Sequence, residues 1–503
     1  MTDLAHPDRL AKAAPTRPSG GAASPARGGA GGTGGELIAG RGAPDAPGPR
    51  HETRATIAGR LLGLRDFGKL VFAPLRDRTG RLQVGLQKAR LEDWWDRRKD
   101  LDGGDLVAFE GTLGFTQKGE PTLWADAVHL QSKASAPRPE KWRGLAAKEL
   151  RYRRRYQDLW VSDGVLEVFV KRSRILSLIR GYLESEGYLE VETPTLHPIA
   201  GGATARPFVT HHNALGMDLF LRIAPELYLK RLIVGGMERV FEVSRNFRNE
   251  GLSLRHNPEF TMLELYEAQA DYRRMMELVE RMFELLAREV CGGREVGWHG
   301  KSFSFEAPFA RRRYADLFRE HAGCEFDDEP AVRAKARELK LHNAEQAGPG
   351  EFWKLMNDVF EATVEDHLLG PVFVTDYPVQ ICPLAKASPD DPRFAERFEV
   401  FVDGMELGNA FSELNDPVEQ ERRFAEQVAS QDPEAPGQVD VDYVQALEVG
   451  MPPTGGLGIG IDRLVMVLCD QDSIRDVLLF PAMRPVVAHE DEARPASSAD
   501  GGS

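Results

Sequence analysis

Residues able to do chemistry gather between Arg239 and Tyr266. Apolar and polar residues alternate at both ends of this segment, while Gly251, Asn257 and Pro258 interrupt its middle. This pattern predicts two strands joined by a charged loop. Because alternate side chains of a strand share a face, one side of the hairpin would carry an arginine, an aromatic ring and a carboxylate. These groups suit a nucleotide phosphate, an adenine ring and a cationic substrate. The residues expected on that side are Ser244, Asn246, Arg248, Phe260, Met262, Glu264 and Tyr266.

Either strand taken alone would also fit an amphipathic hairpin whose charged side is simply solvated. Two further segments with chemical groups argue against that alternative.

A second predicted hairpin carries paired carboxylates. Asp403-Gly404 stands between two apolar runs, which indicates a two-residue turn. With that turn, Phe401 lies opposite Glu406, and Glu399 shares their face. Two carboxylates one diagonal step apart can bridge a hard cation bound to phosphate oxygens, although a repelling surface pair is the alternative. Further along, three side chains alternate onto one face and add another carboxylate beside an aromatic ring: Asn409, Phe411 and Glu413.

The third segment is rich in glycine and runs from Gly455 to Met466. Glycines let a backbone approach a ligand closely, and Arg463 would open the following helix, where phosphate binding or ring stacking is favoured. No Gly-Lys-Ser/Thr follows, so the segment is not a P-loop. It also lacks the strand–helix context of a dinucleotide-binding fingerprint.

Helical periodicity positions these segments. A helix is predicted from a cap at Ser162 or Asp163 to a stop at Gly187, followed by a strand from Tyr188 to Pro194. Further helices are expected at about 272–290, 311–320 and 351–368, and strands between about 372 and 413. The apolar face of the first helix consists of Val168, Phe169, Ile175, Leu176, Ile179 and Leu183.

The N-terminal part has a different pattern. Residues 1–50 are rich in Gly, Ala and Pro and are expected to be disordered. Five short alternating stretches then predict strands, with one helix at 89–98 after the third strand. This layout is typical of an OB barrel, which often holds single-stranded nucleic acid; a barrel that merely supports its neighbour is the alternative. The strands are expected at 56–62, 69–75, 81–86, 105–113 and 121–130.

Composition sets broad limits. The chain has 503 residues and a formal net charge of -14, which neither requires nor excludes nucleic acid, because phosphate affinity depends on local basic surface. No apolar run is long enough for a membrane span, and no secretory signal is visible. Four isolated cysteines, without Cys-x-x-Cys spacing, indicate free and mostly buried thiols in a reducing cytosol. They are Cys291, Cys324, Cys382 and Cys469.

Taken together, the three segments resemble the signature motifs of class II aminoacyl-tRNA synthetases. Within that class the chain closely resembles the bacterial-type lysyl-tRNA synthetases, from about Thr53 to Arg484. The resemblance implies an α+β multidomain protein: a five-stranded OB barrel plus a catalytic domain built on an antiparallel sheet flanked by helices. It is carried by the sequences that begin at Arg222 (RIAPELYLKR), Phe247 (FRNEG), Arg255 (RHNPEFTM), Phe411 (FSELND) and Gly458 (GIGIDR).

The resemblance also implies roles for single residues. Arg248 would grip the α-phosphate of ATP, and Phe260 and Arg463 would hold adenine between them. Glu399 and Glu406 would bind Mg²⁺. Further ATP contacts would come from Glu250, His256 and Gly460. L-Lysine would be bound by Glu264 and Glu413 through its ammonium groups, helped by Gly202, Glu226, Tyr266, Asn409 and Phe411.

In the barrel, the resemblance places an anticodon base of tRNA-Lys on Phe72, with Arg60, Gln83 and Glu120 reading its edges. It implies a cytoplasmic homodimer without membrane contact. The expected divisions are a disordered arm at 1–50, the OB domain at 51–135, a linker at 136–160, the catalytic domain at 161–486 and a disordered tail at 487–503.

Two other functions remain open at this point. A paralogue that lysylates a protein would resemble the catalytic domain only, so the barrel argues against it. A non-catalytic tRNA-binding relative would be expected to lose Arg248, Arg463 or the acidic pair, and all of these are present.

Overall fold

The computed structural model divides into two compact units between Ala146 and Ala147, inside the predicted linker. The predicted arm (Arg9 apart) and the tail from 487 onward lie outside the described residues. Within the described ranges no helix is long and apolar enough to cross a bilayer. The structure describes residues 9, 53–136, 148–341, 351–430 and 437–485.

The first unit is the predicted OB barrel. Its strands pair in the order β1-β5-β6-β4-β3-β2, and a further β1–β3 pairing closes the barrel where Arg60 lies opposite Arg76. All five predicted strands are present, and a two-residue strand, β2, is added to them. The strands are β1 (Thr53–Leu61), β2 (Arg65–Asp66), β3 (Leu70–Asp77), β4 (Gly80–Gln87), β5 (Leu106–Phe115) and β6 (Pro121–Ser132).

The predicted helix at 89–98 is wrong. Two short 3₁₀ segments take its place, η2 (Lys88–Arg90) and η3 (Trp95–Asp100), with turns between them. The turns direct Leu91 and Trp95 into the barrel, where each is 4% exposed. Burial of these two side chains overrides the weak helical preference of the charged residues around them.

The barrel depends on a close approach of β5 to β6. A methyl group at Gly111 would lie 2.1 Å from the carbonyl oxygen of Trp124, which is backbone and cannot rotate away. We expect Gly111→Ala to lower barrel stability by about 1–3 kcal/mol. Gly63→Ala, where a methyl group meets nothing within 4 Å, is the control. Hydrogen exchange of β5 and β6 in the full chain measures the effect, and equal protection in the two variants would contradict it.

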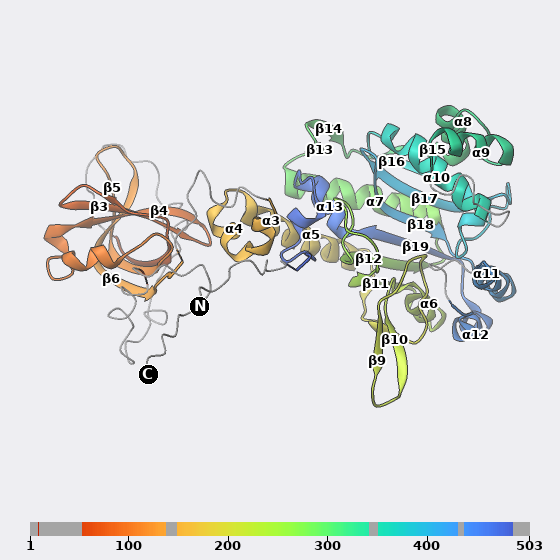
Figure 1. Ribbon diagram of the computed structural model, residues 1–503, viewed down its shortest axis with the longest axis horizontal. Coiled ribbons are helices and arrows are strands. Elements are labelled where there is room, and N and C mark those ends of the chain that lie inside the picture. Colours follow the sequence, from red (N-terminus) through yellow and green to blue (C-terminus); the bar gives the residue numbers. More distant parts are fainter. Residues whose placement is uncertain (1–8, 10–52, 137–147, 342–350, 431–436, 486–503) are drawn as a thin grey trace, which may run out of the picture. The chain divides into compact units, whose positions relative to one another are not determined.

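The second unit is built on an eight-stranded sheet in the order β15-β16-β17-β18-β19-β12-β11-β7 (Figure 1). The predicted antiparallel pairing holds through the centre, whereas the two edge pairs, β15–β16 and β7–β11, are parallel. The strands are β7 (Leu189–Glu190), β11 (Arg239–Phe247), β12 (Glu259–Ala268), β15 (Ala310–Arg313), β16 (Val372–Pro378), β17 (Phe394–Val402), β18 (Met405–Ser412) and β19 (Thr454–Gly460).

Helices cover one face of this sheet (Figure 1). α5 (Val165–Ser185), α7 (Tyr272–Leu286) and α13 (Ile461–Leu468) pack there against apolar residues of the central strands. Leu263 and Leu265 of β12 are fully buried in that layer. Because side chains alternate along a strand, Met262, Glu264 and Tyr266 point to the opposite face. Packing of the apolar side therefore fixes the direction of the chemical groups.

The predicted helices are present with shifted ends. α5 begins after Gly164, in a left-handed conformation, and not at a Ser162 or Asp163 cap, because Ser162 Oγ donates a hydrogen bond to Asp158 of the preceding helix. The helix predicted at 311 starts only at Tyr314, since the residues before it form β15. The predicted helices correspond to α8 (Tyr314–Ala322), α10 (Phe352–Val364) with η6 (Glu365–His367), and α7 continued by η4 (Ala287–Cys291). α9 (Glu329–Glu338) was not predicted, and α3 (Lys148–Arg153) and α4 (Arg155–Val161) occupy the range expected to be a linker.

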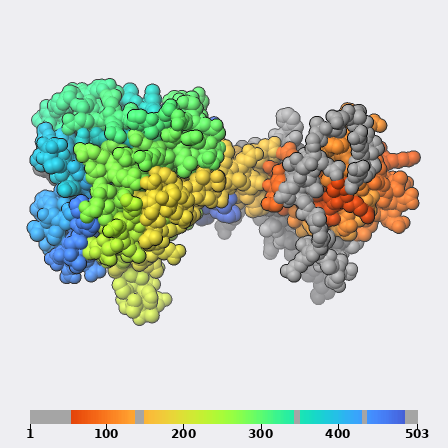
Figure 2. All heavy atoms as spheres, turned by 180° about the vertical axis from the view of Figure 1, so that it is seen from behind, coloured from red at the N-terminus to blue at the C-terminus, as the bar shows by residue number. Residues whose placement is uncertain are grey.

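Most of the remaining elements border the opposite face of the sheet, whereas the β13–β14 hairpin and α14 pack beside α5, α7 and α13 in the helix-covered layer. The β9–β10 hairpin stands away from the body of the unit, in yellow-green in Figure 2. All four cysteines are free; Cys382 is buried and the others are half-buried, so burial is less complete than predicted. The elements are β8 (Leu196–His197), β9 (Val209–His212), β10 (Met217–Leu221), α6 (Glu226–Val234), β13 (Glu295–Trp298), β14 (Lys301–Ser304), η7 (Val379–Ile381), α11 (Pro417–Ala429), α12 (Val441–Gly450) and α14 (Ile474–Val477).

Candidate active site

A cavity of about 410 Å³ lies on the open face of the central strands. It is lined by parts of β12, β18, β19 and α6, together with the loop that carries Arg248. The structure brings all but one of the predicted catalytic-unit residues to this cavity; Glu399 is the exception. Those that line it are Gly202, Glu226, Arg248, Glu250, His256, Phe260, Glu264, Tyr266, Glu406, Asn409, Phe411, Glu413, Gly460 and Arg463.

The first hairpin places its groups as the alternation predicts. Asn246 pairs with Phe260 and Glu242 with Glu264, so the polar side chains of both strands share a face. Arg248 follows the end of β11, and its backbone N–H donates to the carbonyl of Pro258 at 2.9 Å. Its guanidinium carbon lies 5.2 Å from the centre of the Phe260 ring. An arginine fork and an aromatic plane therefore stand side by side in the cavity.

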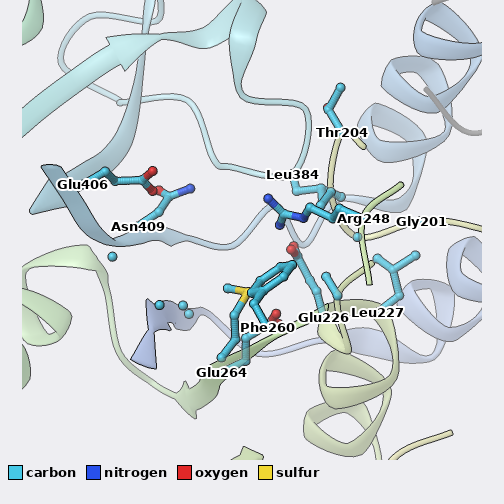
Figure 3. A pocket seen from close by; sticks show the side chains of 18 of the residues that line it. Gly201, Thr204, Glu226, Leu227, Arg248, Phe260, Glu264, Leu384, Glu406 and Asn409 are labelled. Atoms are coloured by element: carbon cyan, nitrogen blue, oxygen red, sulfur yellow. The ribbon is translucent and has the colours of Figure 1, made fainter. Parts of the chain in front are cut away.

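Arg248 is poised for an anion. Within the described part of the chain its Nε atom is buried and has no hydrogen-bond partner. Burial lowers the pKa of its guanidinium, although Glu250, Glu406 and Glu264 act in the opposite direction. A buried donor without an acceptor is costly, and a phosphate oxygen would supply the acceptor. Figure 3 shows Arg248 and Phe260 on one side of the cavity, with Glu406 and Asn409 to the other.

Besides the cationic Arg248, the cavity contains three buried acidic side chains. Glu226, Glu264 and Glu413 are 7%, 4% and 1% exposed. Burial, followed by the charge of Glu226, raises the pKa of Glu264 to about 8. The only hydrogen bond of its carboxyl group within the described residues is a long one, 3.4 Å, from the hydroxyl of Tyr266. The cavity thus contains a cluster of buried carboxyl groups whose ionised form a cation would stabilise.

Two glycines leave room for these groups. Gly456 of β19 lies against the Glu413 carboxylate: a methyl group there would come within 1.9 Å of its Oε1 atom. Gly202 has a φ of +87°, a left-handed conformation that favours glycine, and lies beside Glu226 and Ala224. Glycine at these two positions is therefore required by space in one case and by backbone conformation in the other.

Arg463 lies in the first turn of α13 and contacts two other residues predicted at the ATP site, Glu406 and His256. Its guanidinium forms an ion pair with Glu406 at 3.1 Å and lies 3.0 Å from Nε2 of His256. Burial, followed by the charge of Arg463, lowers the pKa of His256. A neutral His256 accepts the hydrogen bond from Arg463. The predicted stacking of Arg463 on adenine is not tested by these contacts.

The acidic pair is only partly as expected. Phe401 lies opposite Glu406, as predicted from the Asp403-Gly404 turn, but Glu399 lies opposite Asn409 and does not line the cavity. Its carboxylate is held by Arg397 at 2.5 Å and by the hydroxyl of Tyr377 at 2.7 Å. Burial raises the pKa of Glu399 in spite of Arg397.

More carboxylates surround this pair. Burial and neighbouring acids, Glu399 and Glu406 among them, raise the pKa of Glu361 to about 7 and that of Glu365 to about 8. Among the described residues no three acidic, histidine or cysteine side chains are arranged to hold a metal ion by themselves. The excess of negative charge and the oxygen donors fit Mg²⁺ only if phosphate oxygens and water complete its ligands.

Several residues with a clear place in the site were missed by sequence reasoning. Lys230 lies between Glu226 and Glu413, and Arg222 pairs with Glu242 at 2.6 Å. Arg397 holds Glu399. The spacing of Glu226 and Lys230, four residues apart in a helix, was a usable signal. The contacts of Lys230 with Glu413 and of Arg222 with Glu242 depend on tertiary structure and had no local signal.

In the barrel unit, three of the four predicted anticodon residues lie on the outer face of adjacent strands. Phe72 is half-buried, 6.2 Å from both Phe67 and Trp124 between ring centres. Gln83 is 6% exposed; it accepts from Arg65 at 2.7 Å and donates to Thr122 at 2.9 Å.

Arg60 points its guanidinium to the carbonyl of Gly104 at 2.8 Å, and Glu120 is exposed in the turn before β6. Arg65, which was not predicted, stands over Phe72 at 5.8 Å. Gln83 is already bonded on both sides, so the more accessible contacts here are Phe72 and Arg65.

The chain is similar to two families of known domains. Residues 147–484 match the family described as tRNA synthetases class II (D, K and N), and residues 55–130 match the OB-fold nucleic acid binding domain. The family match covers well over half of the chain, so this protein belongs to the class II aminoacyl-tRNA synthetases of the D, K and N group.

Full-length relatives narrow this assignment. The chain is 52% identical over 434 residues to the lysine--tRNA ligase of Moorella thermoacetica, covering 85% of this chain and 88% of that protein. It is 50% identical over 435 residues to the lysine--tRNA ligase of Xanthomonas oryzae pv. oryzae, covering 85% and 86%. Within the synthetases, the chain belongs to the lysine--tRNA ligases.

The raised pKa of Glu264 predicts a pH dependence. The raised pKa keeps the Glu264 carboxyl protonated in the empty cavity below about pH 8. The lysine-binding role expected for Glu264 would require its carboxylate, so lysine binding would release a proton. We expect the lysine KM in ATP–pyrophosphate exchange to fall as pH rises from about 6.5 to 8, by at most about tenfold per pH unit. Glu264→Gln should bind lysine more weakly and lose this slope. A wild-type KM that is flat over this range would contradict the assignment.

Proposed function

We propose that the cavity binds L-lysine and ATP together and joins them to lysyl-adenylate before the lysyl group passes to tRNA-Lys. The observation that supports this most directly is the burial of Glu264 and Glu413 in the same cavity as Arg248 and Phe260. Carboxylates suit the two ammonium groups of lysine, whereas the guanidinium and the ring suit a phosphate and adenine. A neutral or acidic amino acid would leave the buried carboxylates unpaired.

The reaction needs alignment more than proton transfer. An oxygen of the lysine carboxylate attacks the α-phosphorus of ATP, the bond to pyrophosphate breaks, and lysyl-adenylate remains. In the second step a terminal ribose hydroxyl of the tRNA attacks the lysyl carbonyl carbon and AMP leaves. We assign Arg248 to the α-phosphate and Arg463 with His256 and Glu250 to the rest of the nucleotide. Catalysis then rests on orientation and on neutralisation of phosphate charge.

We assign Glu406 and Glu399 to Mg²⁺, which would neutralise phosphate charge when bound. Glu406 faces the cavity, while Arg397 and Tyr377 hold the carboxylate of Glu399 behind it. The proposal is supported by the gathering of acidic groups around this pair. It assigns Arg397 the task of keeping Glu399 ionised, because an adjacent guanidinium favours the charged carboxylate.

We further propose a cytoplasmic homodimer. Free cysteines agree with a reducing compartment. Large apolar side chains are exposed on β7 to β10 and in the β9–β10 turn, which is unusual for a surface in contact with water. They are Leu189 (55%), Leu196 (43%), Val209 (60%), Leu215 (67%) and Met217 (38%).

Substitution of Arg248 tests the first step. Wild-type protein should catalyse lysine-dependent ATP–pyrophosphate exchange. Arg248→Ala should reduce the exchange rate by about 100- to 1000-fold, because a positioned donor to developing phosphate charge is lost. Lysine binding, measured by calorimetry without ATP, should change by less than about fivefold. Equal losses in exchange and in lysine binding would show that Arg248 does not act on the phosphate.

Substitution of Phe72 tests the barrel. Charging of tRNA that bears a UUU anticodon should fall by about tenfold in Phe72→Ala, since stacking of one base on an aromatic ring contributes about 1–3 kcal/mol. Pyrophosphate exchange, which needs no tRNA, should be unchanged. Phe115→Ala, a half-buried aromatic of β5 in the same barrel, is the matched control. A Phe72 variant that charges tRNA normally would remove this residue from anticodon recognition.

A further inference from the structure

Lys230 is a fully buried cation beside the cavity. Its side chain is 0% exposed, and its ammonium group lies 2.5 Å from Glu226 and forms a second ion pair with Glu413. The rings of Tyr266 and Phe411 lie 5.9 and 5.4 Å away and complete its surroundings. Lys230 therefore occupies a cage of two carboxylates and two aromatic faces, the kind of environment that recognises an ammonium ion.

This residue does not itself line the cavity, whereas Glu226, Glu413, Tyr266 and Phe411 all do. Any effect of Lys230 on a ligand must therefore pass through these neighbours. Burial alone would lower the pKa of its ammonium group, but Glu226 and Glu413 raise the pKa above its ordinary value. Lys230 is accordingly a permanent positive charge one layer behind the wall of the cavity.

The net charge of the acidic cluster matches the number of ammonium groups in the proposed ligand, lysine. Glu226, Glu264 and Glu413 contribute three negative charges when ionised, and Lys230 contributes one positive charge. Two negative charges remain, the same number as the ammonium groups of free lysine. The nearby Arg222 and Glu242 pair with each other and leave this balance unchanged.

On the basis of the lysine pocket proposed above, we propose that Lys230 is a positioning residue for lysine recognition. It acts as a resident ammonium group that holds Glu226 and Glu413 ionised and apart. Once Glu264 ionises on ligand binding, the cavity then offers two uncompensated negative charges to the two ammonium groups of the substrate. One oxygen of Glu413 remains available for this purpose: Oε2 is paired with Lys230, whereas the buried Oε1 has no hydrogen-bond partner within the described residues.

Without Lys230, two buried like charges would face each other and one carboxylate would take up a proton. The substrate would then have to displace that proton or meet a neutral carboxyl group. Recognition of lysine would suffer, while the phosphate side of the cavity, around Arg248 and Arg463, would keep its own partners. The role of Lys230 therefore predicts a selective effect on lysine.

The first test uses Lys230→Met, which keeps the shape and removes the charge. In pyrophosphate exchange we expect the lysine KM to rise at least tenfold, while the ATP KM and kcat at saturating lysine change less than threefold. Lys133→Met is the matched control, because Lys133 is also buried between two carboxylates, Asp102 and Asp105, but in the barrel. Its lysine KM should be unchanged.

A second test restores the charge from solution. Lys230→Ala removes the three carbons and the nitrogen that n-propylammonium can replace, and 1-propanol is the uncharged probe of the same chain length. Added n-propylammonium should lower the lysine KM of this variant at least threefold, and 1-propanol should not. In the wild type the same amine should raise the lysine KM or leave it unchanged, because the place of Lys230 is filled.

The outcomes separate the two proposals. Absence of lysine-dependent pyrophosphate exchange in the wild-type protein would contradict the proposed lysine pocket itself. Normal wild-type exchange with a lysine KM in Lys230→Met that is unchanged, or that rises in parallel with the ATP KM, would defeat only the role of Lys230. Equal rescue by 1-propanol, or loss of folding in both variants as seen in thermal unfolding, would make Lys230 a purely structural ion pair and overturn the assignment.

Discussion

Negative charge buried in an enclosed space is the constraint on which this site depends. A carboxylate removed from water must find a cation, or it takes up a proton. The chain supplies the cation itself in three places: Arg222 to Glu242, Arg397 to Glu399, and Lys230 to the pair Glu226 and Glu413. Glu264 is left without an ion pair within the described residues. Cations of the protein thus pair with most of the buried carboxylates, and Glu264 is the one that a ligand alone would balance.

The sheet makes this arrangement rigid. β12 lies between β11 and β19 in the centre of the sheet, and its apolar side is packed under α7 and α13. Glu264 therefore cannot turn toward water without moving the core. Other charged groups of the cavity lie at the ends of elements: Arg248 follows β11 and Glu413 follows β18, while Glu226 and Arg463 lie in the first turns of α6 and α13. Among these groups, Glu264 is therefore the one that is fixed within a strand.

Much of this architecture was accessible from local sequence patterns. Alternation along 239–266 predicted both the strands and the shared face, and the Asp403-Gly404 pair predicted a turn that the structure shows between Val402 and Met405. Local patterns failed where burial outweighed them, as at Trp95, where two short 3₁₀ segments replace one helix. Helix starts also moved, because Ser162 bonds backward to Asp158 and is not free to cap α5.

The candidate site was predictable in its ligand-facing groups and less so in the groups behind them. Arg248, Phe260 and Glu264 follow from residue type and strand parity. Lys230 does not, because its second partner, Glu413, lies directly after β18 and far away in the sequence. Glu399 shows the same limit: its pairing opposite Asn409 results from a bulge between Val400 and Phe401 that no local signal marks.

The division of β12 into an apolar side and a cavity side has an evolutionary consequence. Leu263 and Leu265 secure the layer of helices, whereas Met262, Glu264 and Tyr266 line the cavity. Replacements of Met262 and Glu264 can alter the chemistry of the cavity without disturbing the packing of Leu263 and Leu265, whereas Tyr266 also belongs to a second apolar cluster. A single scaffold can in this way diversify its choice of substrate while its thermodynamic stability is inherited almost intact.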